Sequence, residues 1–157
     1  MFNMPSIPQR GYATRVFDND VHSNNTENFA IAGTAVSGVP TGSGIMVNSN
    51  DQVEIFNNRI TNNNTANIVI SSYFSANFAG QIELAAEFDP YPEQIMIYDN
   101  SFEGGGTAPG LDYLTQLRNA LYGEQGAFPD ILWDGIVNPE NDGKIPAVCI
   151  DNGDAEL

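Results

Sequence analysis

The sequence is poor in cysteine, histidine and positive charge, and each shortage excludes a class of function. Among 157 residues there is one cysteine, Cys149, and one histidine, His22. The single cysteine excludes an internal disulfide and Cys-x-x-Cys sites, and the single histidine excludes a multi-histidine metal site. Five Lys and Arg residues stand against 20 Asp and Glu, which gives a net charge of −15. Because such a surface repels phosphate backbones, nucleic acid is not expected as a partner.

Long hydrophobic runs are also missing. No run approaches the roughly 18 apolar residues of a membrane span, so we do not expect a transmembrane protein. The first five residues, Met-Phe-Asn-Met-Pro, lack the charged and apolar regions of a signal peptide. This start fits either a cytosolic protein or a sequence that begins after its export signal.

The chain does contain an internal repeat. Residues 20–31 align without a gap with residues 59–70, a shift of 39 positions (59 − 20). The alignment extends upstream, where residues 16–19 (Val-Phe-Asp-Asn) match residues 55–58 (Ile-Phe-Asn-Asn), and residues 97–100 (Ile-Tyr-Asp-Asn) form a third copy. Self-similarity at a fixed period is typical of solenoids, in which each unit buries its apolar side against its neighbours.

A shorter spacing predicts the length of one rung. The apolar segments 44–47 and 67–70 begin 23 positions apart (67 − 44). We interpret this distance as one complete rung of three strands. The copies of the longer motif are separated by 39 positions (55 − 16) and by 42 positions (97 − 55), which we interpret as a rung plus an inserted loop. The expected loops are residues 29–44 and 75–93.

The prediction is an all-β, right-handed parallel β-helix of one domain, residues 1–157. Its core rungs span residues 12–104, and a helix with a terminal capping segment spans residues 109–157. Leucines at three- and four-residue steps predict an amphipathic helix over residues 111–122, and residues 145–152 fit a fourth, degraded repeat. We expect a C-terminal fragment of a longer solenoid, whose open ends expose unpaired strand groups and favour end-to-end association.

Stacked rungs would align equivalent side chains. Asn19, Asn58 and Asn100 would lie above one another, and their amides could form a hydrogen-bonded ladder. Asparagine also tolerates the left-handed backbone that a sharp corner needs.

The same stacking predicts an outward aromatic stripe of Phe17, Phe56 and Tyr98. A bare stripe of this kind should be covered, and we expect the helix over residues 111–122 to lie on it. The alternative is a docking stripe for a partner or a saccharide, which would use the ring faces for stacking.

Four segments carry a resemblance to a known family: residues 53–58, 65–73, 89–93 and 129–135. They resemble the bacterial parallel β-helix repeat-containing proteins, which belong to the right-handed β-helix, pectin-lyase-like class. The likeness covers nearly the whole chain but fits only the C-terminal part of longer members, so it implies further N-terminal rungs.

The resemblance also implies a location and a partner. Members carry a signal peptide or lipoprotein signal, which implies a secreted, periplasmic or cell-surface protein. They often occur beside, or fused to, a c-type-cytochrome-like protein, which implies a partner of that kind. No catalytic residue carries over, and this sequence has neither the export signal nor a haem motif.

Enzymes on this fold use clustered carboxylates, often with Ca²⁺ and a basic residue. The weak calcium candidates are Asp89, Glu93 and Asp99, although no Asp-x-Asp-x-Asp-Gly loop supports them. The further acids are Asp18, Glu83, Glu87 and Glu103, whereas the basic residues are scattered: Arg10, Arg15, Arg59, Arg118 and Lys144.

Three single residues have simpler interpretations. His22 is expected at the surface, Cys149 as a buried small hydrophobe, and Trp133 in the packing that joins the C-terminal segment to the rungs. The sequence thus predicts an exported structural or binding module for a partner protein or a glycan, with catalytic residues unknown. The alternative is a polysaccharide lyase, hydrolase or epimerase whose site lies partly on missing rungs.

Overall fold

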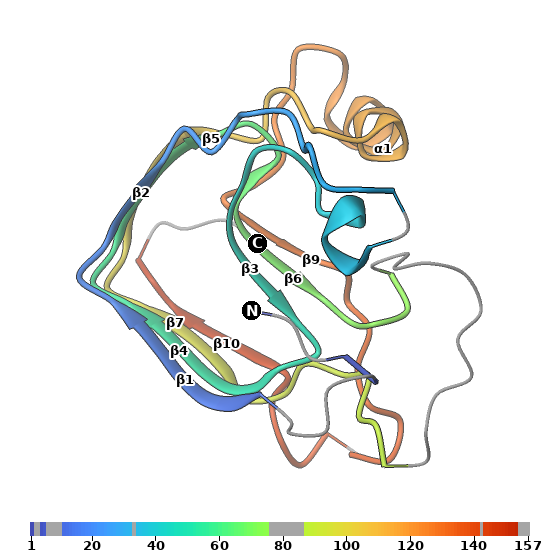
Figure 1. The fold of residues 1–157 in the computed structure, drawn as a ribbon. Helices are drawn as coiled ribbons and strands as arrows, with labels where there is room; N and C mark the ends of the chain where they lie inside the picture. The colour runs from blue at the N-terminus through green and yellow to red at the C-terminus, as the bar shows by residue number, and fades with distance from the viewer. Residues whose placement is uncertain (2–3, 6–10, 33, 76–86, 142, 154–157) are drawn as a thin grey trace.

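The computed structural model describes residues 1, 4–5, 11–32, 34–75, 87–141 and 143–153. In this part the protein is mostly β, with three parallel sheets and one α-helix (Figure 1). Sheet I has the order β1-β4-β7-β10, sheet II β2-β5-β8, and sheet III β3-β6-β9. The elements are β1 (Tyr12–Phe17), β2 (Asp20–His22), the 3₁₀ helix η1 (Ala35–Gly38), β3 (Ser43–Asn48), β4 (Asp51–Phe56), β5 (Arg59–Asn63), β6 (Ala66–Ser71), β7 (Ile95–Tyr98), β8 (Ser101–Gly105), α1 (Asp112–Tyr122), β9 (Ile131–Trp133) and β10 (Val148–Asp151).

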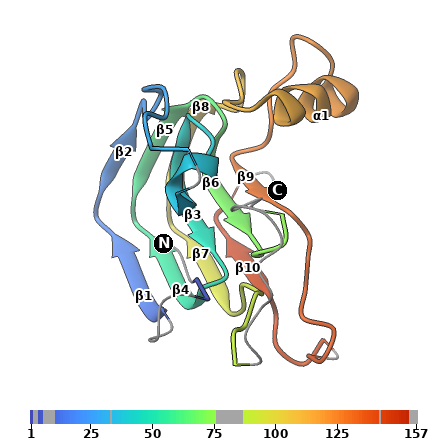
Figure 2. The same ribbon diagram turned by 45° about the vertical axis from the view of Figure 1, so that its right-hand side comes forward.

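The chain passes through the three sheets repeatedly and in the same order. β1, β2 and β3 form the first passage, β4, β5 and β6 the second, and β7, β8 and β9 the third, after which β10 returns to sheet I. Figure 2 shows successive strands of each sheet lying side by side. The three copies of the repeat motif are therefore strands of sheet I, and they pair in parallel with one another.

The register of the pairs follows the sequence repeat. Val16 pairs with Ile55 and Ile55 with Ile97, so the two predicted spacings of the longer motif are also the spacings between paired strands. Ile97 then pairs with Ile150 of the degraded copy. On sheet III, Ile45 pairs with Ile68. These two residues are separated in sequence by the same number of positions as the apolar segments 44–47 and 67–70. The shorter spacing therefore corresponds to one passage through the three sheets, as predicted.

The extra residues of the longer spacings lie at the two corners that border sheet III. In the first passage, the segment with η1 connects β2 to β3, and in the third passage α1 lies between β8 and β9. The long connections from β6 to β7 and from β9 to β10 leave sheet III at its other side. Residues 76–86 of the predicted loop 75–93, including Glu83, lie outside the described residues.

One part of the sequence alignment does not hold in the structure. Ile31 aligns with Ile70 in sequence, but Ile31 is 79% exposed on the first connection whereas Ile70 is buried in β6. The residue that pairs with Ile70 is Val47 of β3. The longer repeat is interrupted there because the inserted segment separates β2 from β3.

The corner between sheets I and II depends on two adjacent residues with different roles. The first residue takes a left-handed backbone, with φ of 57° at Asp18, 54° at Asn57 and 52° at Asp99, a conformation that Asp and Asn tolerate better than most residues. The second residue supplies the side-chain amide that bonds to the next repeat. The backbone turn and the ladder thus come from different positions of the Asx-Asn pair.

The amides of Asn19, Asn58, Asn100 and Asn152 lie in one line. In each step the Nδ2 atom donates to the Oδ1 atom of the next asparagine at 2.9 Å. Asn58 is 2% and Asn100 is 9% exposed. The first three are the asparagines chosen from the repeat, and Asn152 of the degraded copy extends the line.

The core fills the space that the three sheets enclose (Figure 1). It consists of β-branched residues, which pack well on pleated strands, and Trp133 packs against it from β9, as predicted. Burial is greatest in the middle repeats: the fully buried members include Val47, Val53, Ile55, Ile60, Ile68, Ile95 and Ile131.

The prediction that the helix covers the aromatic stripe is wrong. α1 lies outside sheet III (Figure 1), where Leu114 and Leu117 face a groove on that sheet. Phe17 on sheet I remains 46% exposed. The position of α1 is set instead by Arg118, which is 8% exposed and whose guanidinium donates to the carbonyls of Thr107 and Gly126 on either side of the helix.

Candidate functional site

The outward face of sheet I carries a continuous aromatic stripe. The ring centroids of Phe17 and Phe56 are 5.1 Å apart with planes at 7°, and those of Phe56 and Tyr98 are 4.9 Å apart with planes at 1°. The rings stack because these residues pair directly in the parallel register of β1, β4 and β7. The structure thus brings together all three residues of the predicted stripe.

This stacking changes what the stripe can bind. In a parallel stack, the faces of Phe56 are occupied by Phe17 on one side and Tyr98 on the other. Ring edges, which carry the positive part of the aromatic quadrupole, are left to face solvent. The expectation that a saccharide stacks on a row of ring faces therefore does not fit this geometry.

Arg15 lies beside the stripe on the same face. Its guanidinium carbon is 5.0 Å from the centroid of Phe56 and 5.8 Å from that of Phe17. Its Nε donates to Glu54 Oε2 at 2.8 Å, and this hydrogen bond, with the charge of Glu54, raises the pKa of Arg15 above its ordinary value. The guanidinium is thereby held beside the aromatic row.

The face continues through Met96 and Cys149, which pair in register on β7 and β10. Met96 is 46% exposed, and Cys149 is exposed as well. The prediction of a buried Cys149 is wrong because β10 alternates: Val148 and Ile150 pack against the core and Cys149 points the other way.

Cys149 should therefore react in the folded protein. We expect Ellman's reagent to modify one thiol per chain without denaturant, because an exposed thiol is accessible. The stoichiometry in native buffer and in guanidinium chloride should be equal. A thiol that reacts only after unfolding would contradict the placement of Cys149 on the outer face.

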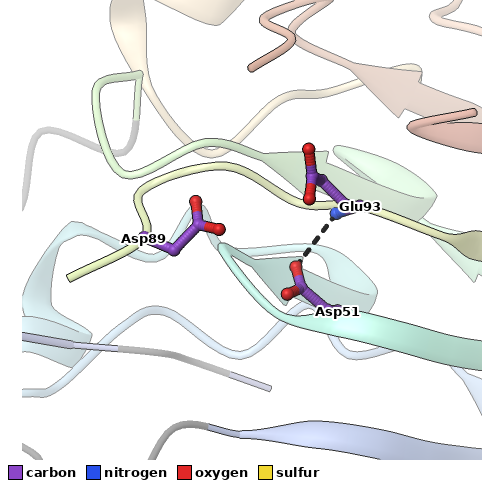
Figure 3. Close-up of side chains that lie close together, drawn as sticks. All are labelled: Asp51, Asp89 and Glu93. Carbon is purple, nitrogen blue, oxygen red and sulfur yellow. Dashed lines mark hydrogen bonds between the residues drawn. The ribbon is translucent and has the colours of Figure 1, made fainter. Parts of the chain in front are cut away.

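An acidic cluster lies at the opposite end of β7 from the aromatic residue Tyr98. Asp51, Asp89 and Glu93 are half-buried, and one oxygen from each lies within 4.8 Å of the others (Figure 3). Glu93 N donates to Asp51 Oδ1 at 3.2 Å, and Asn141 Nδ2 donates to Glu93 Oε1 at 3.1 Å. Three carboxylates are oxygen ligands of the kind that Ca²⁺ prefers.

Two of the three predicted calcium candidates belong to the cluster, and its third member is Asp51 instead of Asp99. Asp89 and Glu93 come together, whereas Asp99 follows β7 at its other end and lines an open polar hollow with Asp151. Asp51 was missed, although a signal for it was present. It precedes Glu93 by the same sequence separation that relates Ile55 to Ile97, and the two acidic residues pair across the strands.

Two arginines of the described chain are engaged away from the acidic cluster. Arg59 lies on sheet II with Nη atoms 3.0 Å from Asp20 and 3.7 Å from Glu103. Arg118 of α1 is buried and donates to the carbonyls of Thr107 and Gly126. His22 is exposed at the end of β2, as predicted. Neither these two arginines nor His22 belongs to the acidic cluster.

A further surface, which the sequence did not predict, is an apolar groove of about 310 Å³ on sheet III. Its floor is formed by Met46, Val69 and Leu132, which pair in register, and Leu114 and Leu117 of α1 form one wall. The signal for it was the apolar residue at the middle outward position of each strand, Met46 in β3 and Val69 in β6.

Comparisons with known proteins do not place this chain: no protein-family model, no curated protein and no solved structure matches it. Within the described residues, no helix is long and apolar enough to cross a membrane.

Proposed function

We propose that the chain is a right-handed parallel β-helix of the pectin-lyase-like class, similar to the bacterial parallel β-helix repeat-containing proteins. Three observations support the proposal: the constant order of the three sheets, the short passage that separates β3 from β6 on sheet III, and the line of asparagine amides. The right hand follows from the general rule for parallel crossovers. By the same resemblance, we propose an exported protein that forms the C-terminal part of a longer β-helix.

On this scaffold we propose a binding role: the outer face of sheet I docks a partner protein. The observation that carries the proposal is the uncovered stripe of stacked aromatics with Arg15 and Met96 beside it. Aromatic residues, Met and Arg are the types enriched at protein interfaces. The net charge of −15 favours a partner with a positive rim, and the resemblance suggests a c-type-cytochrome-like protein.

A glycan is the less favoured ligand because the ring faces are occupied by one another. The enzymatic alternative is also less favoured because Arg15 and Arg59 are held in ion pairs on outer faces. A glycan array and a uronate-depolymerisation assay test these alternatives directly. Glycan binding that depends on Phe56, or measurable depolymerisation, would overturn the proposal.

The exposed Cys149 allows a direct test of docking. An environment-sensitive fluorophore on Cys149, two strands from Phe56, should change its emission when the c-type-cytochrome-like neighbour is added. Met96→Asp should weaken the response about tenfold, because a charge at the centre of an interface must be desolvated. The matched control is His22→Asp, which places the same charge on an exposed position of sheet II. Equal loss in both variants, or no response, contradicts docking on sheet I.

The proposed role needs no cofactor, and calcium binding stays a prediction whose test belongs at Asp51, Asp89 and Glu93. If calcium binds, millimolar CaCl₂ should raise the melting temperature by mass action, and the Asp51→Asn/Glu93→Gln double variant should abolish the rise. Asp99→Asn is the matched control, because Asp99 lies at the other end of β7. An unchanged melting temperature in calcium contradicts the prediction.

A further inference from the structure

The two insertions that interrupt the repeat lie against the same sheet. The first passage carries η1 between β2 and β3, and the third passage carries α1 between β8 and β9, whereas β5 and β6 of the second passage follow each other directly. Both η1 and α1 lie outside sheet III (Figure 1). In solenoids, the insertions of individual repeats gather on one face, which is often the binding face. The outer face of sheet III is therefore where a ligand site is expected in this fold.

Both insertions border the apolar groove on that face. Gly38 of η1 and the nearby Pro40 line the groove from the first passage, and α1 lines it from the third. Leu114 of α1 is 8% exposed, so it packs closely, whereas Leu117 in the same wall is 43% exposed. The apolar wall thus extends beyond the contact that holds the helix. Exposed apolar surface beside a groove is typical of an interaction site.

One carboxylate gives the lining its charge. Asp134 Oδ2 accepts from Ser72 N and from Ser75 Oγ, and Asp134 Oδ1 accepts from Ile136 N at 3.0 Å. A carboxylate has about four lone-pair sites, so Oδ1 can accept one further donor. Among the described residues that line the groove there is no Lys, Arg or His. The groove therefore combines apolar walls with a single negative charge.

We propose that this groove binds a small organic amine with an apolar body. The ammonium group donates to Asp134, and the apolar body covers Leu117 and Val69. The volume of about 310 Å³ lies at the lower end of the range of small-molecule sites, roughly 300–1,000 Å³, which are also mostly apolar with a few polar groups. The net charge of −15 favours a cation over an anion as well. This site is on sheet III, so it is independent of docking on sheet I.

The test uses octylamine as the probe and octanoate as its anionic counterpart of equal chain length. Isothermal titration calorimetry at neutral pH should show saturable 1:1 binding of octylamine. Octanoate should bind at least about tenfold more weakly, because it loses the charge-assisted hydrogen bond and meets a carboxylate instead. No saturation up to roughly 5 mM octylamine, or equal binding of octylamine and octanoate, overturns the proposal.

Matched variants of α1 locate the site. Leu117→Lys places an ammonium group in the groove, where it competes with the ligand for Asp134, and it should abolish octylamine binding. Leu121→Lys makes the same change of charge on the same helix, at a residue that is 63% exposed and does not belong to the groove lining, and it should retain binding. Circular dichroism reports whether each variant folds. Equal binding by the two variants would mean that the amine only associates with the acidic surface, and it overturns the proposal.

A third variant tests the charge itself and does not depend on how Leu117→Lys folds. Asp134→Asn keeps a side-chain acceptor and removes the negative charge, so the preference for octylamine over octanoate should be lost. A preference that persists in Asp134→Asn overturns the proposal. Light scattering across protein concentration tests a second copy of the chain as the occupant. Self-association that Leu117→Lys abolishes and Leu121→Lys does not would make the groove an interface between copies, and it overturns the proposal.

Discussion

Replacing Asn58 by alanine is expected to lower the free energy of unfolding by about 3–5 kcal/mol, because several buried groups lose their partner at once. Asn58 Nδ2 donates to the carbonyls of Val16 and Phe56 and to Asn100 Oδ1, each at 2.9 Å. Asn58 Oδ1 accepts from Asn19. Alanine removes the Nδ2 donor in a site that is 2% exposed, and of these bonds only the one to Asn100 Oδ1 is partly kept, by the backbone N of residue 58. Urea unfolding with linear extrapolation measures the change.

Asn19→Ala is the matched control, because the same chemistry is removed where water can replace it. Asn19 is exposed, so the expected loss is at most about 1 kcal/mol. Asn58→Asp keeps the shape of the side chain but turns a carboxylate oxygen toward three acceptors in a buried site, so it should destabilise at least as much as alanine. If Asn58→Ala destabilises no more than Asn19→Ala, the amide line is not what stabilises the corner.

The repeat in the sequence was sufficient to predict most strands and their register. The prediction succeeded because aliphatic residues at equivalent positions pair directly, as Val16, Ile55 and Ile97 do. It failed at Ile31, which aligns with the identical residue Ile70 but lies in the connection between β2 and β3, outside the sheets. Identical residues in two repeats occupy equivalent positions only where both repeats have the same number of residues up to the next strand.

The positions of side chains on the surface could be predicted less well. An amphipathic pattern shows that α1 has an apolar side, but it does not show which sheet receives that side. Arg118, one of the scattered basic residues of the sequence, is buried and bonds the helix to its flanking segments. Cys149 was misplaced because an apolar run was given more weight than the alternation of β10.

The acidic cluster was half predictable. Asp89 and Glu93 are close in sequence. Asp51 begins β4, one repeat earlier, and pairs directly with Glu93. Applying the repeat to polar residues as well as to aliphatic ones would have identified Asp51 and separated it from Asp99. Nothing in the sequence shows that the rings of Phe17, Phe56 and Tyr98 would stack with parallel planes, since this depends on side-chain rotamers.

The second large effect is expected from the core of the middle repeats. Ile55→Ala and Ile97→Ala should each lower the free energy of unfolding by about 2–5 kcal/mol, because each removes a buried aliphatic chain from between two neighbours and leaves a cavity. Ile55 is 0% and Ile97 is 1% exposed, and each has a paired aliphatic residue on both sides. Urea unfolding of both variants against the parent chain measures the losses.

The same substitution at Ile150, the last residue of the aliphatic row, distinguishes the contribution of a second neighbouring repeat from that of hydrophobic burial alone. Ile150 pairs on one side only, with Ile97, and it is half-buried, so Ile150→Ala should cost about 1 kcal/mol, in line with its smaller burial. Ile55 and Ile150 lose the same atoms, and their difference therefore measures what the second neighbour contributes. In a stack in which each repeat stabilises only its neighbours, that difference persists in every middle position. Equal losses at Ile55, Ile97 and Ile150 would mean that the chain does not stabilise itself layer upon layer.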